Sequence, residues 1–102
     1  MILVWSPEAF ADLAGERRYL AARNAVGARN QLRRIRRAAR ALLTFPRMGT
    51  QVTFALQMAF VFAVPGTEYL LIYDLDGDVV RIRRVWSGRR AQPPFGRPTA
   101  GD

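Results

Sequence analysis

The residues of this chain that could do chemistry are arginines, because the usual catalytic and metal-binding side chains are missing. The 102-residue sequence has no histidine and no cysteine, and all 16 of its basic residues are arginine. Histidine is the commonest general base and metal ligand, and cysteine supplies thiolate nucleophiles and zinc ligands. The sequence therefore excludes serine–histidine and cysteine–histidine catalysis and any disulfide framework, and we expect neither a metal nor a cofactor.

Three of these arginines, Arg84, Arg89 and Arg90, gather at the end of the last predicted strand and directly after it. A guanidinium stays charged and presents a flat fork that matches phosphate and carboxylate groups. Together with the net charge of +8, this favours a contact surface for nucleic acid or for an acidic protein. The alternative is a solvated strand end whose arginines pair with carboxylates such as Asp74 or Glu16.

Two aromatic residues, Tyr73 and Trp86, are further candidates for partner contacts. Tyr73 could line an open face of the sheet, although a buried tyrosine with a bonded hydroxyl is more common. Trp86 could be an exposed anchor or a core residue. Strict alternation puts Ile82, Arg84 and Trp86 on one face of their strand and Arg81, Arg83 and Val85 on the other. The pattern does not decide which set faces inward.

The first half of the chain predicts two helices that position these residues. Ser6 is a good N-cap and Pro7 suits a first helical position, so we predict a helix from Pro7 to about Arg23. Asn24 can cap a second helix that ends near Leu43. Because almost nothing joins them, the two amphipathic helices should form an antiparallel hairpin. The arginine run at 33–40 on the second helix is expected of any solvated face, with nucleic-acid binding as the alternative.

The second half predicts strands at residues 57–64, 69–75 and 79–86, separated by turns at 65–68 and 76–78. With a strand at residues 2–5, we expect an α+β fold in which the helical hairpin covers one face of a mainly antiparallel four-stranded sheet. Residues 1–90 should form a single domain. The proline- and glycine-rich residues 91–102 should form a flexible tail.

Several short segments, taken in order, resemble a known family over about residues 1–90. They are Trp5–Ala9 with Asp12-Leu13, Phe45–Gly49, Tyr69–Tyr73 and Ile82–Arg90. Each is weak alone, but their order and spacing resemble the RelE/ParE toxins of bacterial type II toxin–antitoxin systems. The resemblance implies the fold predicted above. It also implies a cognate antitoxin that wraps the toxin with an extended, often acidic segment, giving a hetero-oligomer.

Members of the superfamily act by one of two mechanisms, and the residues that each mechanism requires can be compared with those of this sequence. RelE-like members cleave mRNA inside the ribosome without a metal, using basic residues and a tyrosine. ParE-like members generally lack that set and poison DNA gyrase. Arg89 stands where the nucleases have an arginine that stabilises the transition state, so it is the catalytic candidate if the chain is a nuclease. Leu70 and Phe95, however, stand where a basic residue and the tyrosine are expected, and the strand at 57–62 has no charge.

The ParE-like, gyrase-inhibiting branch is therefore favoured, with an mRNA endonuclease and a non-toxic basic binding module as alternatives. Two positions depart from the ParE-like pattern as well. Phe60 stands where many of these toxins have an arginine, and Ser87 where they have a histidine. The N-terminus has no signal-peptide pattern, and the apolar run at 54–64 is too short to span a bilayer. We therefore expect a cytoplasmic protein that contacts its target or antitoxin through Arg84, Arg89, Arg90, Tyr73 and Trp86.

Overall fold

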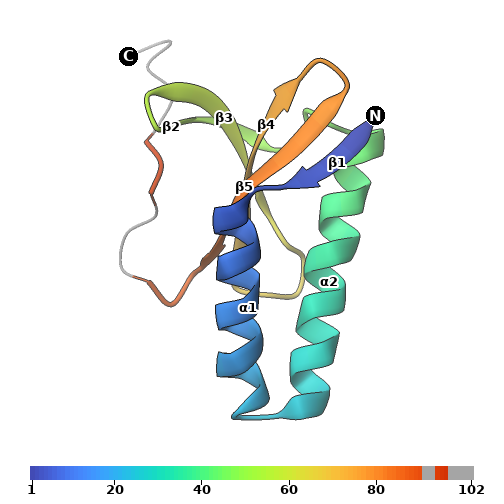
Figure 1. Ribbon diagram of the computed structural model, residues 1–102, viewed down its shortest axis with the longest axis vertical. Helices are drawn as coiled ribbons and strands as arrows, with labels where there is room; N and C mark the ends of the chain where they lie inside the picture. The colour runs from blue at the N-terminus through green and yellow to red at the C-terminus, as the bar shows by residue number, and fades with distance from the viewer. Residues whose placement is uncertain (91–93, 97–102) are drawn as a thin grey trace.

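Two helices pack on one face of a five-stranded sheet in the computed structural model, which describes residues 1–90 and 94–96 (Figure 1). The elements follow in the order β1 (Ile2–Trp5), α1 (Pro7–Ala21), α2 (Ala25–Thr44), β2 (Thr50–Phe54), β3 (Gln57–Ala63), β4 (Tyr69–Asp76) and β5 (Val79–Ser87). The predicted α+β class is confirmed, and so is the helical hairpin. No helix in residues 1–90 and 94–96 is long and apolar enough to cross a membrane.

Side-chain caps set the start of both helices, as the sequence predicted. The Ser6 hydroxyl accepts a hydrogen bond from the Ala9 N–H (3.1 Å) and donates one to the Arg83 carbonyl on β5 (2.9 Å). The Asn24 side chain accepts the Gly27 N–H at 3.0 Å and starts α2. Each cap satisfies a backbone N–H that has no partner within its helix. Ser6 therefore both begins α1 and ties its first turn to the sheet.

The sheet has the strand order β1-β5-β4-β3-β2, and only the β1–β5 pair is parallel. The prediction of four strands was wrong, because the sequence-based assignment missed β2. This strand is short, its first two residues are exposed, and it alternates too weakly to stand out. Its pairing with β3 across the tight turn at Ala55-Leu56 makes it a strand. The prediction of a mainly antiparallel sheet is confirmed.

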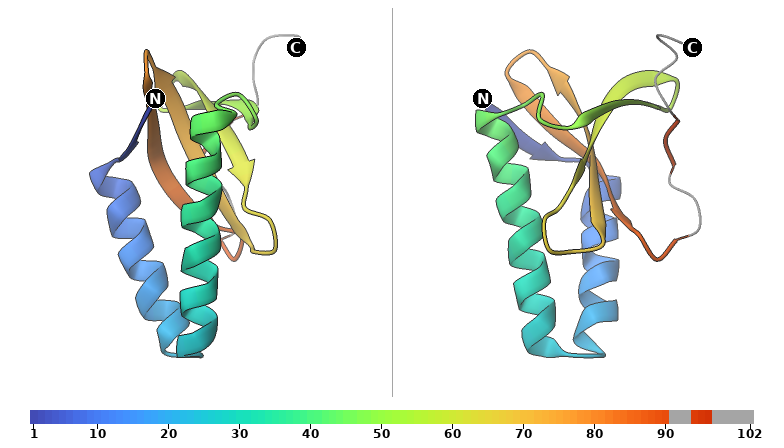
Figure 2. Two further views of the ribbon diagram at one scale, coloured as in Figure 1. Left: turned by 90° about the vertical axis from the view of Figure 1, so that its right-hand side faces the viewer. Right: turned by 180° about the vertical axis from the view of Figure 1, so that it is seen from behind.

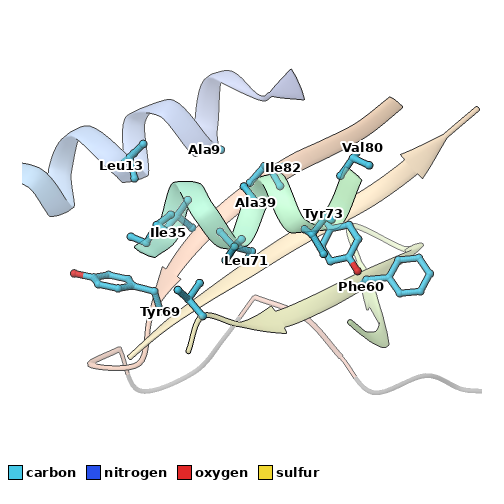
Figure 3. Packing of buried hydrophobic residues seen from close by; sticks show 14 of the residues in the cluster. Ala9, Leu13, Ile35, Ala39, Phe60, Tyr69, Leu71, Tyr73, Val80 and Ile82 are labelled. Atoms are coloured by element: carbon cyan, nitrogen blue, oxygen red, sulfur yellow. The ribbon is translucent and has the colours of Figure 1, made fainter. Parts of the chain in front are cut away.

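The two helices lie along one side of the sheet (Figure 2), and the main core fills the space between these layers (Figure 3). Its largest fully buried side chains include Ile35 and Leu42 from α2, Leu71 and Tyr73 from β4, and Ile82 from β5. A smaller apolar cluster occupies the opposite face of the sheet. It consists of Val52, Ala59 and Ile72, with Phe54, Val61, Trp86 and Phe95 packed against it. The sheet is therefore apolar on both faces at its centre.

A β-bulge in β5 breaks the alternation that the sequence suggested. Ile72 pairs with Arg84 and Tyr73 pairs with Ile82, so Arg83 is the extra residue. A bulge shifts which side chains face the core. Ile82 faces the helices before the bulge and Val85 faces them after it, and both are fully buried. Neither of the two predicted residue sets therefore lies wholly on one face.

The described part of the segment after β5 lies against β2. Thr53 and Gly96 exchange two backbone hydrogen bonds, of 2.9 and 2.8 Å, and Phe95 packs on the smaller apolar cluster. Residues 94–96 thus lie beside β2, the strand at one edge of the sheet, and bond to its backbone. The rest of the predicted tail, residues 91–93 and 97–102, lies outside the described residues.

Candidate partner-binding surface

Arg84 is held at the edge of the sheet by Asp12 on α1. Its Nε and Nη2 atoms donate to the two oxygens of the Asp12 carboxylate at 2.7 and 3.0 Å. The Val85 N–H also donates to Asp12 (3.0 Å), at a point of β5 beyond its last pairing with β1. The hydrogen bond to Asp12 raises the pKa of Arg84 even though burial opposes its charge. The Asp12 carboxylate therefore satisfies a backbone N–H of β5 that no described strand pairs with on this side, and it also fixes the Arg84 side chain.

Arg89 is fixed more completely, by two carboxylates and an aromatic ring. Its guanidinium donates to Glu16 on α1 and to Glu68 before β4, each at 2.8 Å. It also lies 3.6 Å from the ring centroid of Tyr19. The Glu16 carboxylate, which is buried, accepts a further hydrogen bond of 2.9 Å from the Tyr69 hydroxyl. We call Arg89, Glu16, Glu68, Tyr69 and Tyr19 the Arg89 cluster.

The Arg89 cluster also shifts the pKa values of Tyr69 and Arg89. Burial raises the pKa of the Tyr69 hydroxyl to about 12, with the Glu16 carboxylate adding to the shift and Arg89 opposing it. Burial disfavours the charge on Arg89, but its hydrogen bonds to Glu16, Tyr69 and Glu68 raise its pKa above the ordinary value. Tyr69 thus stays neutral and Arg89 stays charged at physiological pH.

Trp86 lies on the face of the sheet away from the helices, and two guanidinium groups lie close to its ring. The guanidinium carbon of Arg90 is 4.5 Å from the ring of Trp86, and that of Arg84 is 5.5 Å from it. Both distances suit a cation–π interaction. Trp86 packs on the smaller apolar cluster, and its indole N–H is buried without a partner among the described residues. Arg90 is exposed and forms no ion pair within the described part of the chain.

Tyr73 is fully buried in the main core. Its ring stacks on Phe60 with the centroids 5.4 Å apart. Its hydroxyl donates to the Pro46 carbonyl (2.9 Å) and accepts the Gly49 N–H (3.0 Å). Burial raises the pKa of this hydroxyl. Tyr73 therefore anchors the segment between α2 and β2 in the interior of the protein, where a partner would not reach it.

The structure brings together three of the five predicted site residues and separates the other two. Arg84, Trp86 and Arg90 form one stacked group, which we call the Trp86 stack. Arg89 turns away from it toward α1, and Tyr73 lies inside the core. The sequence suggested Glu16 as a carboxylate partner in this region, but Asp12 was named only as part of a family segment and Glu68 was not named as a partner. The regular spacing of Glu8, Asp12 and Glu16, four residues apart, could have indicated an acidic row on one face of α1.

The positions that differ from the family's usual residues are mostly interior ones. Phe60 and Ser87 are buried, and Phe95 packs on the smaller apolar cluster. The Ser87 hydroxyl accepts the Arg89 N–H at 3.2 Å and donates to Glu68 at 3.4 Å. An arginine at position 60 would need space in the core beside Tyr73. These residues thus belong to the packing of this chain, and they place no acid or base beside Arg89.

Comparison with known proteins agrees with this architecture. Residues 3–92 match the family described as "ParE toxin of type II toxin-antitoxin system, parDE". Among solved structures, the chain is similar to one titled "Chromosomal ParDE TA system from P. aeruginosa", with a TM-score of 0.74 and 16% identity. That match covers 85% of this chain and 95% of the other. No curated protein matches the sequence. Since the family match spans most of the chain, the protein belongs to the ParE toxin family of type II toxin–antitoxin systems.

Proposed function

We propose that this protein is a bacterial toxin that inhibits DNA gyrase in the cytoplasm and is neutralised by a cognate antitoxin. The observation that supports gyrase over mRNA as the target is that Arg89 is paired with two carboxylates of the protein itself. Arg89 is the residue of this chain that matches the transition-state arginine of the nucleases, and here it is neutralised by Glu16 and Glu68. A guanidinium held by two carboxylates has little charge left to offer a phosphate.

The groups beside Arg89 that could act as acid or base are engaged by the fold, since both carboxylates, Glu16 and Glu68, are paired with Arg89. The Tyr69 hydroxyl belongs to the Arg89 cluster, but its proton is donated to Glu16 and its pKa is raised to about 12. General acid–base catalysis usually contributes a factor of about 10²–10⁴ to a rate. A protein that lacks both a free acid–base group and a free arginine to contact the RNA phosphate is better suited to binding a protein target than to cutting RNA.

The antitoxin we propose is a protein with an acidic segment that contacts the Trp86 stack. Arg90 offers an exposed cation there, and the half-buried Trp86 ring offers an aromatic surface beside it. Aromatic and arginine side chains are enriched at energetically important points of interfaces. The solved structure with the similar fold is titled as a ParDE system, that is, a toxin with its partner. We accordingly propose a hetero-oligomer of this chain with its antitoxin.

The test is a supercoiling assay with purified gyrase and the purified protein. We expect loss of supercoiling, restored by adding the antitoxin encoded beside the toxin gene. Arg90→Ala should weaken binding of gyrase or of the antitoxin, whereas the matched control Arg47→Ala, at an exposed arginine between α2 and β2, should leave both unchanged. Unaltered gyrase activity together with mRNA cleavage would identify a nuclease instead. Harmless expression without the neighbouring gene would indicate a non-toxic binding protein.

A further inference from the structure

The exposed side of α2 carries a continuous row of arginines. Arg29, Arg33, Arg36 and Arg40 follow one another at steps of three or four residues, so they lie along one stripe of the helix. All four are exposed. We call them the α2 arginine row. Helix geometry makes the row about 16 Å long.

Acidic residues do not neutralise this row. The helix from Ala25 to Thr44 contains no Asp or Glu. The carboxylates of α1 and of the sheet that form ion pairs are bound by Arg81, Arg83, Arg84 and Arg89. Within residues 1–90 and 94–96, no arginine of α2 forms an ion pair. The excess positive charge of the protein is therefore concentrated on α2, and it remains available to a ligand.

The row forms one wall of a groove between the two helices. Arg17 contributes from the α1 side, and small apolar side chains such as Ala21 and Ala28 lie between the walls. The groove has a volume of about 790 Å³. Its polar side chains are all arginines, which donate hydrogen bonds and cannot accept them. The groove thus suits a ligand that presents a series of anionic acceptors.

We propose that the α2 arginine row binds the phosphate backbone of duplex DNA. A row of about 16 Å spans about five phosphates of one strand, which are spaced 3.4 Å apart along the duplex axis. None of the described residues that line the groove is an aromatic on which unpaired bases could stack, so a duplex fits better than a single strand. The choice of DNA rests on the proposed action on gyrase, whose substrate is duplex DNA. The assignment to phosphate rests on the row itself.

The test measures binding of the full chain to a fluorescent DNA duplex by anisotropy over a range of salt concentrations. Each phosphate contact contributes about 0.9 to the slope of log K against log salt. The double variant Arg33→Gln/Arg36→Gln should therefore reduce this slope by about 1.8, with a loss of affinity at low salt. Glutamine is a good helix former, and Arg33 and Arg36 form no ion pair with the residues that the structure describes. The matched control Arg18→Gln/Arg47→Gln changes the net charge equally at exposed arginines outside the groove.

An equal change of slope in both double variants would overturn the proposal, since it would show only a dependence on net charge. Tighter binding of single-stranded DNA, duplex RNA or polyglutamate of matched charge would also overturn it, the last by pointing to an acidic protein. Circular dichroism establishes that each variant is folded. Gyrase inhibition without DNA binding would refute this inference alone, whereas DNA binding without gyrase inhibition would refute the proposed function alone.

Discussion

Glu16→Ala should destabilise the protein by about 3 kcal/mol, because it removes the central acceptor of the Arg89 cluster. The Tyr69 hydroxyl would lose its hydrogen bond of 2.9 Å to Glu16, and Tyr69 is only 1% exposed, so water could not easily replace this acceptor. An unsatisfied buried group costs about 1–3 kcal/mol. Arg89 would keep Glu68 and is 30% exposed in its side chain, so its share is only about 1 kcal/mol. The sum is about 2–4 kcal/mol.

The assay is urea unfolding followed by far-UV circular dichroism, with thermal unfolding alongside. For a domain of this size, each kcal/mol lowers Tm by about 4–8 °C, so we expect a decrease of at least about 10 °C. Glu8→Ala is the matched control, because Glu8 is an exposed carboxylate on the same helix. It loses the interaction with the helix N-terminus, about 0.3–1 kcal/mol, and a Coulombic interaction with Arg84 that is the smallest of those acting on this arginine.

A double-mutant cycle with Tyr69→Phe isolates the hydrogen bond from other effects of the substitution. Contacting residues usually show coupling energies of about 0.5–3 kcal/mol. If Glu16→Ala costs no more than Glu8→Ala, or if the cycle gives no coupling, Glu16 is not the structural centre of this cluster. Arg89 would then be held only loosely by the fold and would be available to a phosphate.

Three further predictions concern turns and buried hydroxyls. Tyr73→Phe should destabilise the fold by about 1–2 kcal/mol in urea unfolding, because the segment after α2 loses two hydrogen bonds; an unchanged midpoint would contradict this. Replacing Ala55-Leu56 by Asn-Gly should raise stability by about 1–2 kcal/mol, since both residues have positive φ angles (51° and 64°) that cost a non-glycine residue energy; a lower Tm would show that the turn is not strained. Stability should fall as the pH rises from 10 to about 12, because the raised pKa of Tyr69 makes the folded state retain a proton that the unfolded chain releases. Tyr69→Phe should lack that part of the decline, and an identical pH profile for the variant would refute the assignment.

The local signals in the sequence predicted the helices and most strands well. Ser6-Pro7 and Asn24 are strong capping signals, and both helices begin where these residues place them. The turns at 65–68 and 76–78 separate strands whose apolar patterns are clear. β2 has neither a strong pattern nor burial at its first residues, so it depends on its partner β3 for its identity as a strand.

The arrangement of the site could be predicted only in part, because it depends on contacts between distant segments. The bulge at Arg83 moves Val85 to the inner face, and nothing in the local sequence marks it. Arg89 and Glu16 are 73 residues apart, as are Asp12 and the Val85 N–H that it accepts. Composition indicated that the arginines matter. The fold decides that Arg84 and Arg89 are bound by carboxylates while Arg90 and the α2 arginine row remain available.

The parallel pairing of β1 with β5 has a consequence for how the protein is made. Ile2 pairs with Val79, and the Ser6 hydroxyl donates to a carbonyl 77 residues later in the chain. The first strand therefore has no neighbour until residues 79–82 have been synthesised, and pairing over such a separation slows folding. A chain whose translation stops before residue 79 lacks the partner of β1, the carboxylate-bound arginines and the Trp86 stack together. Folding of this protein is thus coupled to synthesis of β5, and translation interrupted before residue 79 yields fragments without the Trp86 stack.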